Sequence, residues 1–166
     1  GLPVPPEQLV SYIYEPAVSP HLAAELEKCP IDMNKIQSDF HHIATQFDVV
    51  VAEGSGGIIC PLRMDSSPIM LTDVIQTLHL PILIIAHAGL GTINSTVLTA
   101  AYAKQHNIIV NGIILNQYDS DNLMHRDNKK QIERLTGIPV VACVKPNETE
   151  LSVSAESLLH LCNDIS

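Results

Sequence analysis

Short apolar runs alternate with helix-length stretches through the second half of this 166-residue chain. The runs at residues 81–86, 108–115 and 138–144 have the length of strands and almost no polar alternation, which is typical of strands covered on both faces. Helices are predicted between and after them, at residues 92–106, 126–136 and 152–162. Strands and helices in this alternation predict an α/β fold, with a mostly parallel sheet and helices on both of its faces.

The first half of the chain predicts one more strand and two more helices. Apolar residues recur every three or four positions from Met33 to Phe47, so we expect an amphipathic helix there with Asp32 as its N-cap. A shorter helix is expected at residues 71–78. Residues 49–52, Val-Val-Val-Ala, predict a further buried strand of the same sheet. Because no repeat or linker interrupts the pattern, residues 1–166 are predicted to form a single α/β domain.

The charge balance bears on the partners and on the location of the protein. The net charge is −9, with 9 scattered basic residues against 18 acidic ones, so no nucleic-acid partner is expected. No apolar run has the length of a membrane span. The four cysteines lack metal-ligand spacing and no targeting peptide is visible, so we expect free, mostly buried thiols in a cytoplasmic protein.

An acidic residue and three glycines follow the predicted strand at residues 49–52. Glu53 would lie at the carboxyl edge of the sheet, where open α/β folds bind ligands. Gly54, Gly56 and Gly57 allow positive φ and a close approach of the backbone to a phosphate or substrate. A carboxylate in this setting is a natural Mg²⁺ ligand. A solvated glutamate followed by a flexible turn is an equally good interpretation of the segment alone.

Two other strand ends carry candidate binding residues. Gly89 and Gly91 precede a predicted helix start, whose free amides attract an anion, although an ordinary strand-to-helix turn is an even alternative. Asn94 replaces the third glycine of a dinucleotide fingerprint, which argues against an NAD site. Asn116 and Gln117 end the next strand with carboxamides that suit the edge of a purine base, whereas a turn-forming asparagine is the simpler interpretation.

Other side-chain chemistry is sparse. Among the eight histidines, His87 and His21 are the better site candidates, and neither a metal cluster nor a nucleophile elbow is indicated. No GxxxxGK[ST] sequence occurs, so we do not expect this chain by itself to hold nucleotide phosphates in the P-loop manner. The chain begins with Gly1 in what reads as the middle of a loop, and we expect that an N-terminal P-loop portion is lacking.

Seven segments, in this order along the chain, resemble dethiobiotin synthetase, the ATP-dependent ligase of biotin synthesis. The similarity extends over nearly the whole chain from about Tyr12 onward. No single motif is decisive, but the ordered set is quite specific. The segments are EPAVSPHLAA from Glu15, VVAEGSGG from Val50, PL from Pro61, LPILII from Leu80, LGTIN from Leu90, GIILN from Gly112 and LTGIPV from Leu135.

The resemblance implies a fold, a reaction and an assembly. It implies a P-loop-type α/β fold and a homodimer. Members of this family use ATP and Mg²⁺ to close a cyclic urea from 7,8-diaminopelargonate and CO₂. In such an enzyme phosphoryl transfer depends on positioning and on charge neutralisation.

The resemblance also implies roles for individual residues. Glu53 would be the magnesium ligand. The residues that would contact the nucleotide, together with Glu53, are Gly54, Ser55, Gly56, Asn116, Gln117, Val144, Lys145 and Pro146. The residues that would contact the substrate are Gly57, Leu90, Gly91 and Asn94, of which the last three would bind its carboxylate from the partner subunit.

The sequence departs from the family pattern at three places. Ser55 stands where alanine is usual, and Lys145 stands where proline is expected. The P-loop, the catalytic lysine and the second magnesium-binding acid are not found, so no catalytic residue is identified in this chain. A non-catalytic fragment, a regulatory or dimerisation domain, a related amidoligase and a phosphotransacetylase-associated domain therefore remain alternatives.

Overall fold

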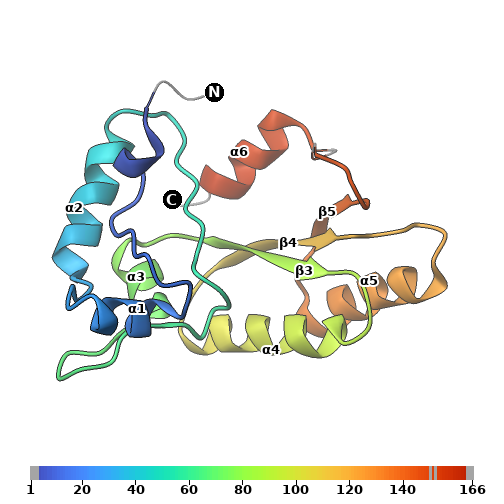
Figure 1. The fold of residues 1–166 in the computed structure, drawn as a ribbon. Coiled ribbons are helices and arrows are strands. Elements are labelled where there is room, and N and C mark those ends of the chain that lie inside the picture. Colours follow the sequence, from blue (N-terminus) through green and yellow to red (C-terminus); the bar gives the residue numbers. More distant parts are fainter. Residues whose placement is uncertain (1–3, 150, 152, 164–166) are drawn as a thin grey trace. The chain divides into compact units, whose positions relative to one another are not determined.

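The structure is a computed structural model that describes residues 4–149, 151 and 153–163 (Figure 1). The chain divides into two compact units, Gly1–His79 and Leu80–Ser166. The single domain expected over residues 1–166 stays a prediction.

The second unit contains the predicted parallel sheet. Its strands are hydrogen-bonded in the order β3-β4-β5, and both pairs are parallel. Helices α4 and α5 lie on one face of the sheet and α6 lies on the other (Figure 1). The elements are β3 (Ile82–His87), α4 (Thr92–Gln105), β4 (Val110–Asn116), α5 (Leu123–Thr136), β5 (Val140–Val144) and α6 (Ala155–Asn163). The predicted α/β class is confirmed, and each of these elements was predicted within about three residues of its bounds.

Side chains at the two ends of α5 explain its bounds. The Asn122 side chain accepts hydrogen bonds from the Met124 and His125 N–H groups, so the helix begins earlier than predicted. Gly137 ends the helix with φ 71°, and its N–H donates to the Glu133 carbonyl at 2.9 Å, as expected of a C-terminal glycine stop.

The core of the second unit lies between the sheet and its helices. Ile113, Leu115 and Ile132 are fully buried, and Ile84 and Ala100 pack in the same cluster. Burial of such aliphatic side chains stabilises the unit by about 1.5–3 kcal/mol each. Ile84, Ile113 and Leu115 belong to the continuous apolar pattern of the strands, so here the sequence pattern and the packing agree.

The regular elements described in the first unit are short helices and one short antiparallel strand pair, and the rest of its described residues form turns and loops. The predicted helices are confirmed: Asp32 caps α2 by accepting from the Asn34 N–H at 2.8 Å, and α3 follows the second strand. Helix α1, the 3-10 turn and the two short strands were not predicted. The elements are η1 (Pro6–Gln8), α1 (Pro20–Leu26), α2 (Met33–Ala44), β1 (Pro61–Arg63), β2 (Ile69–Met70) and α3 (Leu71–Thr77).

The strand predicted at residues 49–52 is not formed. These residues carry no regular secondary structure, and Val49 and Val51 are 45% and 82% exposed. A strand is stable only beside a hydrogen-bonded neighbour, and among the described residues 4–79 the strand pairing is that of β1 with β2. Glu53 therefore follows an irregular segment, and its predicted place at the carboxyl end of a strand is wrong for this structure.

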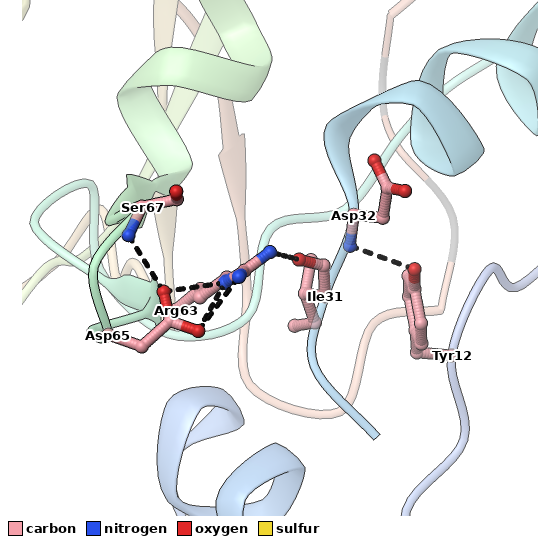
Figure 2. A network of polar contacts seen from close by, with 6 residues as sticks. All are labelled: Tyr12, Ile31, Asp32, Arg63, Asp65 and Ser67. Carbon is pink, nitrogen blue, oxygen red and sulfur yellow. Dashed lines mark hydrogen bonds and ion pairs between the residues drawn. The ribbon is translucent and has the colours of Figure 1, made fainter. Parts of the chain in front are cut away.

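A polar network fixes the β1–β2 hairpin against the chain segment before α2 (Figure 2). The Arg63 guanidinium binds both carboxylate oxygens of Asp65 at 2.8 Å, and it donates to the Ile31 carbonyl at 3.3 Å. The hydrogen bond from Arg63 holds the pKa of the Asp65 carboxyl below its usual value. The Asp32 N–H donates to the Tyr12 hydroxyl at 2.9 Å, so the two residues before α2 are hydrogen-bonded both to Arg63 and to Tyr12.

We expect Gly112→Ala to destabilise the second unit, because strand β4 passes close to β5 at this residue. A Cβ at position 112 would lie 2.7 Å and 3.0 Å from the two Cγ atoms of Val141. A β-branched side chain cannot easily rotate away, so the substitution should cost about 1–3 kcal/mol in the free energy of unfolding, measured by urea denaturation.

The control is the same substitution in a Val141→Ala background. Removing the two Cγ atoms should abolish most of the cost of Gly112→Ala in a double-mutant cycle. An equal cost in both backgrounds would show that the glycine matters for another reason.

Candidate functional site

The acid-and-glycine segment borders a cavity in the first unit. The cavity has a volume of about 1070 Å³, and its wall includes residues 49–57. The apolar side of α2 lines the same space with Ile36, Phe40 and Ile43, and none of the residues of α2 is buried. Residues 49–57 therefore border an open, largely apolar hollow.

One of the three glycines in this segment has a backbone conformation that favours glycine, and a second lies close to a leucine side chain. Gly56 has φ +84°, which disfavours other residues. A Cβ on Gly54 would lie 2.8 Å from Cδ2 of Leu71, so the backbone passes close to that side chain. At Gly57 a Cβ would meet nothing within 4 Å and φ is not positive, so the expected need for glycine is not seen there.

Glu53 itself is exposed, as are the four residues after it. Its carboxylate is a hard oxygen donor that solvent reaches, which fits the ligand preference of Mg²⁺. Among the described residues there is no group of three His, Cys, Asp or Glu side chains that could hold a metal. A magnesium ion at Glu53 would thus depend on phosphate oxygens and water for most of its ligands, as is usual for this ion.

The β3–α4 loop (residues 88–91) shows the geometry of an anion-binding helix start. Gly91 takes the N-cap position of α4 with φ 90°, a left-handed conformation that favours glycine. The amides of Ile93 and Asn94 in the first turn have no intrahelical acceptor. Leu90 is 93% exposed, and Asn94 is exposed as well. Solvent therefore reaches residues on both sides of the helix start, and free amides at a helix start attract anions.

Hydrogen bonds to neighbouring elements fix the first residues of this loop. The Gly89 N–H donates to Nδ1 of His87 at 2.9 Å, and the Ala88 N–H donates to the Asn116 carbonyl at 2.8 Å. Asn128 of α5, a buried residue, donates from Nδ2 to the Ala88 and Gly89 carbonyls at 2.8 Å and 3.1 Å. Our sequence analysis missed Asn128. The available signal was an asparagine one helical turn before the core residue Ile132.

The candidate base-binding residues lie at the same sheet edge. Asn116 pairs with His87 on one side and with Val144 on the other, and the Tyr118 N–H donates to the Val144 carbonyl at 2.8 Å. Asn116 and Gln117 are exposed. The Asn116 Oδ1 accepts from the Gln117 N–H, and Gln117 has φ 57°, so the asparagine also stabilises a turn, as its simpler interpretation predicts.

The loop after β5 is open and polar. Lys145 and Pro146 are exposed, and the Lys145 N–H donates to the Glu148 carboxylate at 2.8 Å. The structure thus brings Asn116, Gln117 and residues 144–146 together at one edge, beside the β3–α4 loop. The Glu53 segment belongs to the other unit.

The other chemically distinctive side chains have separate surroundings. Nδ1 of His21 is buried and has no hydrogen-bond partner in the described part of the chain. Cys29 is exposed, whereas burial raises the pKa of the Cys60 and Cys143 thiols, which keeps them protonated near neutral pH. The Cys162 side chain lies outside the described residues. No helix among the described residues is both long and apolar enough to cross a bilayer.

Comparison with known proteins gives one consistent family. A family model described as an AAA domain, of the P-loop NTPase type, matches residues 1–153. An ATP-dependent dethiobiotin synthetase BioD of Clostridium botulinum is 50% identical over 143 residues, which are 86% of this chain and 63% of that protein. A second from the same species is 46% identical over 160 residues, 96% of this chain and 70% of that protein. One from Brachyspira hyodysenteriae is 50% identical over 139 residues, 83% of this chain and 63% of that protein.

The lengths of these relatives exceed that of the matched region. The chain spans 63% and 61% of two Clostridium botulinum relatives that it matches, so somewhat more than a third of each has no counterpart in the alignment. The matched region nevertheless includes most of this chain at high identity. The chain therefore belongs to the AAA domain family and, within it, to the family of the ATP-dependent dethiobiotin synthetases.

Proposed function

We propose that the protein acts as a dethiobiotin synthetase, which uses ATP and Mg²⁺ to convert 7,8-diaminopelargonate and CO₂ into dethiobiotin, ADP and phosphate. The observation that carries this proposal is the identity of 46–50% to proteins of that name over 83–96% of the chain. The sheet edge supports it, because an open helix start and a pair of carboxamides lie beside each other there.

The proposed reaction proceeds through three bond-forming steps. One substrate amine attacks CO₂ and loses a proton, which gives a carbamate. A carbamate oxygen then attacks the γ-phosphorus of ATP and ADP leaves, and the second amine attacks the carbonyl carbon as phosphate leaves. Phosphoryl transfer of this kind needs chiefly positioning and charge neutralisation, the second of which bound Mg²⁺ supplies.

Residues of this chain take three roles in the proposal. Glu53 holds Mg²⁺, and residues 54–57 lie against the nucleotide and the substrate. Asn116 and Gln117 bind the adenine, with residues 144–146 beside it. Leu90, Gly91 and Asn94 bind the substrate carboxylate. No residue of the chain is assigned to the β- and γ-phosphates, because the sequence contains no GxxxxGK[ST] loop.

The proposal includes a homodimer in the cytoplasm, with neither nucleic acid nor membrane as a partner. The carboxylate-binding loop of each subunit would serve the site of the other. A side chain as exposed as Leu90 fits such a role, because contact with a partner would remove its apolar surface from water.

A second candidate is a non-catalytic piece of the same fold, since residues 1–166 contain no GxxxxGK[ST] sequence. The two candidates are separated by incubating the purified protein with ¹³C-bicarbonate, MgATP and 7,8-diaminopelargonate. Formation of ¹³C-dethiobiotin, detected by mass spectrometry, supports the enzyme. Binding of MgATP without labelled product supports the non-catalytic piece, and sequencing the codons before Gly1 shows whether a P-loop is encoded there.

In the complete protein, we expect Glu53→Gln to lower turnover about 100-fold, since the loss of one charged magnesium ligand removes roughly 3 kcal/mol of transition-state stabilisation. Stability should change little, because Glu53 is exposed and packs in no core. Turnover is measured against Mg²⁺ concentration, with partial recovery expected at high Mg²⁺.

Glu25→Gln is the matched control, because Glu25 is an exposed glutamate of the same unit outside the cavity wall. It should leave turnover and the Mg²⁺ dependence unchanged. Unchanged turnover of Glu53→Gln at low Mg²⁺ would remove Glu53 from the metal site.

We expect Asn94→Ala to weaken the binding of 7,8-diaminopelargonate about 10-fold and that of ATP less than about 2-fold, because the lost hydrogen bond is to a charged carboxylate. Both dissociation constants are measured by calorimetry. The methyl ester of the substrate is the control, since it lacks the charge and should bind both proteins equally. Equal weakening of both ligands would instead make Asn94 a structural cap.

A further inference from the structure

We propose that Asn128 is a positioning residue, which holds the β3–α4 loop (residues 88–91) in the conformation that binds the substrate carboxylate. This role rests on the proposed function, in which Leu90, Gly91 and Asn94 contact that carboxylate. Asn128 itself lies on α5, about 40 residues along the chain from the loop, and its part is to act through the backbone of Ala88 and Gly89.

The hydrogen bonds of Asn128 are specific to a carboxamide. Its Nδ2 donates to the Ala88 carbonyl at 2.8 Å and to the Gly89 carbonyl at 3.1 Å, and the residue is 7% exposed. Both partners are acceptors only, so the nitrogen of the amide must face them. A neutral carboxamide has two N–H groups, one for each carbonyl, whereas a carboxylate of the same shape would place oxygen against oxygen.

These bonds complete the hydrogen bonding of the buried half of the loop. The Gly89 N–H is taken by His87 Nδ1, and the Gly89 carbonyl also accepts from the Thr92 N–H at 3.3 Å. The Ala88 N–H is taken by the Asn116 carbonyl. Every backbone polar group of Ala88 and Gly89 therefore has a protein partner. The next two residues, Leu90 and Gly91, are exposed, so one half of the loop is fixed and the other half faces solvent.

Loss of the Asn128 side chain would remove the hydrogen bonds that hold the Ala88 and Gly89 carbonyls. Two buried carbonyls would lose a donor: the Gly89 carbonyl would keep only the Thr92 N–H at 3.3 Å, and the Ala88 carbonyl would keep none of the hydrogen bonds described above. A buried acceptor without a partner is costly enough that the backbone moves to reach water. A shift of the Ala88–Gly89 backbone would carry Gly91 and the first amides of α4 with it. Recognition of an anion by backbone amides depends on their direction, so affinity for the carboxylate would fall.

A purely structural role for Asn128 makes a different prediction. If Asn128 only stabilised the packing of α5 on the loop, its loss would lower the melting temperature without a selective effect on one ligand. Ile132 provides the matched control, because it lies one turn further along α5 and is fully buried. It packs in the same cluster as Ala88, but its aliphatic side chain cannot hydrogen-bond to the loop. Whichever of Ile132→Val and Ile132→Ala matches the fall in melting temperature of the Asn128 variant serves as the comparison.

The test uses Asn128→Ala and the near-isosteric Asn128→Asp in the 166-residue chain, with two measurements. Calorimetry with 7,8-diaminopelargonate should give dissociation constants raised about 10-fold, with less than about 2-fold change for ATP and none for the methyl ester. Hydrogen exchange at the amides of residues 90–94 should become about 10-fold faster. The stability-matched Ile132 variant should change neither quantity.

Asn128→Ser is the milder variant, for use where Asn128→Ala does not fold. Its hydroxyl keeps one donor, so intermediate affinity and exchange are expected. Substrate affinities or loop exchange rates that match those of the Ile132 variant would overturn the proposal. Failure of the unsubstituted protein to bind 7,8-diaminopelargonate would instead count against the proposed function, whereas the exchange rates would still decide whether Asn128 positions the loop.

Discussion

The parallel pairing of β3, β4 and β5 is the constraint on which the candidate site in the second unit depends. The register places His87 beside Asn116 and Asn116 beside Val144, so three connections that are far apart in the sequence begin at one edge. All the carboxyl ends of parallel strands point the same way. Just beyond them, the Ala88 N–H donates to the Asn116 carbonyl and the Tyr118 N–H donates to the Val144 carbonyl. A shift of one residue in this register would turn the buried aliphatic side chains outward, so the core also fixes the arrangement of the edge.

A single buried asparagine joins this edge to the helix layer. Asn128 lies on α5, which follows strand β4. It hydrogen-bonds to the β3–α4 loop, which comes before β4 in the chain. A buried polar side chain is stable only when its hydrogen bonds are made, so Asn128 and the loop constrain each other. Elsewhere on α5, Ile132 packs in the aliphatic core, His125 accepts from the Asp119 N–H, and Glu133 accepts from the Val140 N–H. Aliphatic packing tolerates small displacements better than hydrogen bonds do.

Residues 49–52 show that an apolar pattern alone does not predict that a strand forms. Three valines and an alanine have the composition of a buried strand, yet the structure leaves Val51 mostly exposed and unpaired. An apolar pattern indicates that a segment can form a buried strand. The strand forms only if neighbouring strands pair with it, and the pattern does not specify those strands. Helix α2 is an intermediate case, because Met33 and Ile36 pack against a small core cluster, whereas Phe40 and Ile43 line the cavity.

The sequence by itself determined the elements whose signals are local. These were the aliphatic strands and helices of the second unit, the Asp32 cap and the family resemblance, because each depends on composition, spacing or order along the chain. Only the tertiary structure decided that residues 49–52 are unpaired, that Asn116 lies between His87 and Val144, and that Asn128 reaches the β3–α4 loop. These facts depend on contacts between residues distant in sequence. The pairing of a hydrogen-bond donor with its acceptor produces no periodic pattern in the sequence from which it could be predicted.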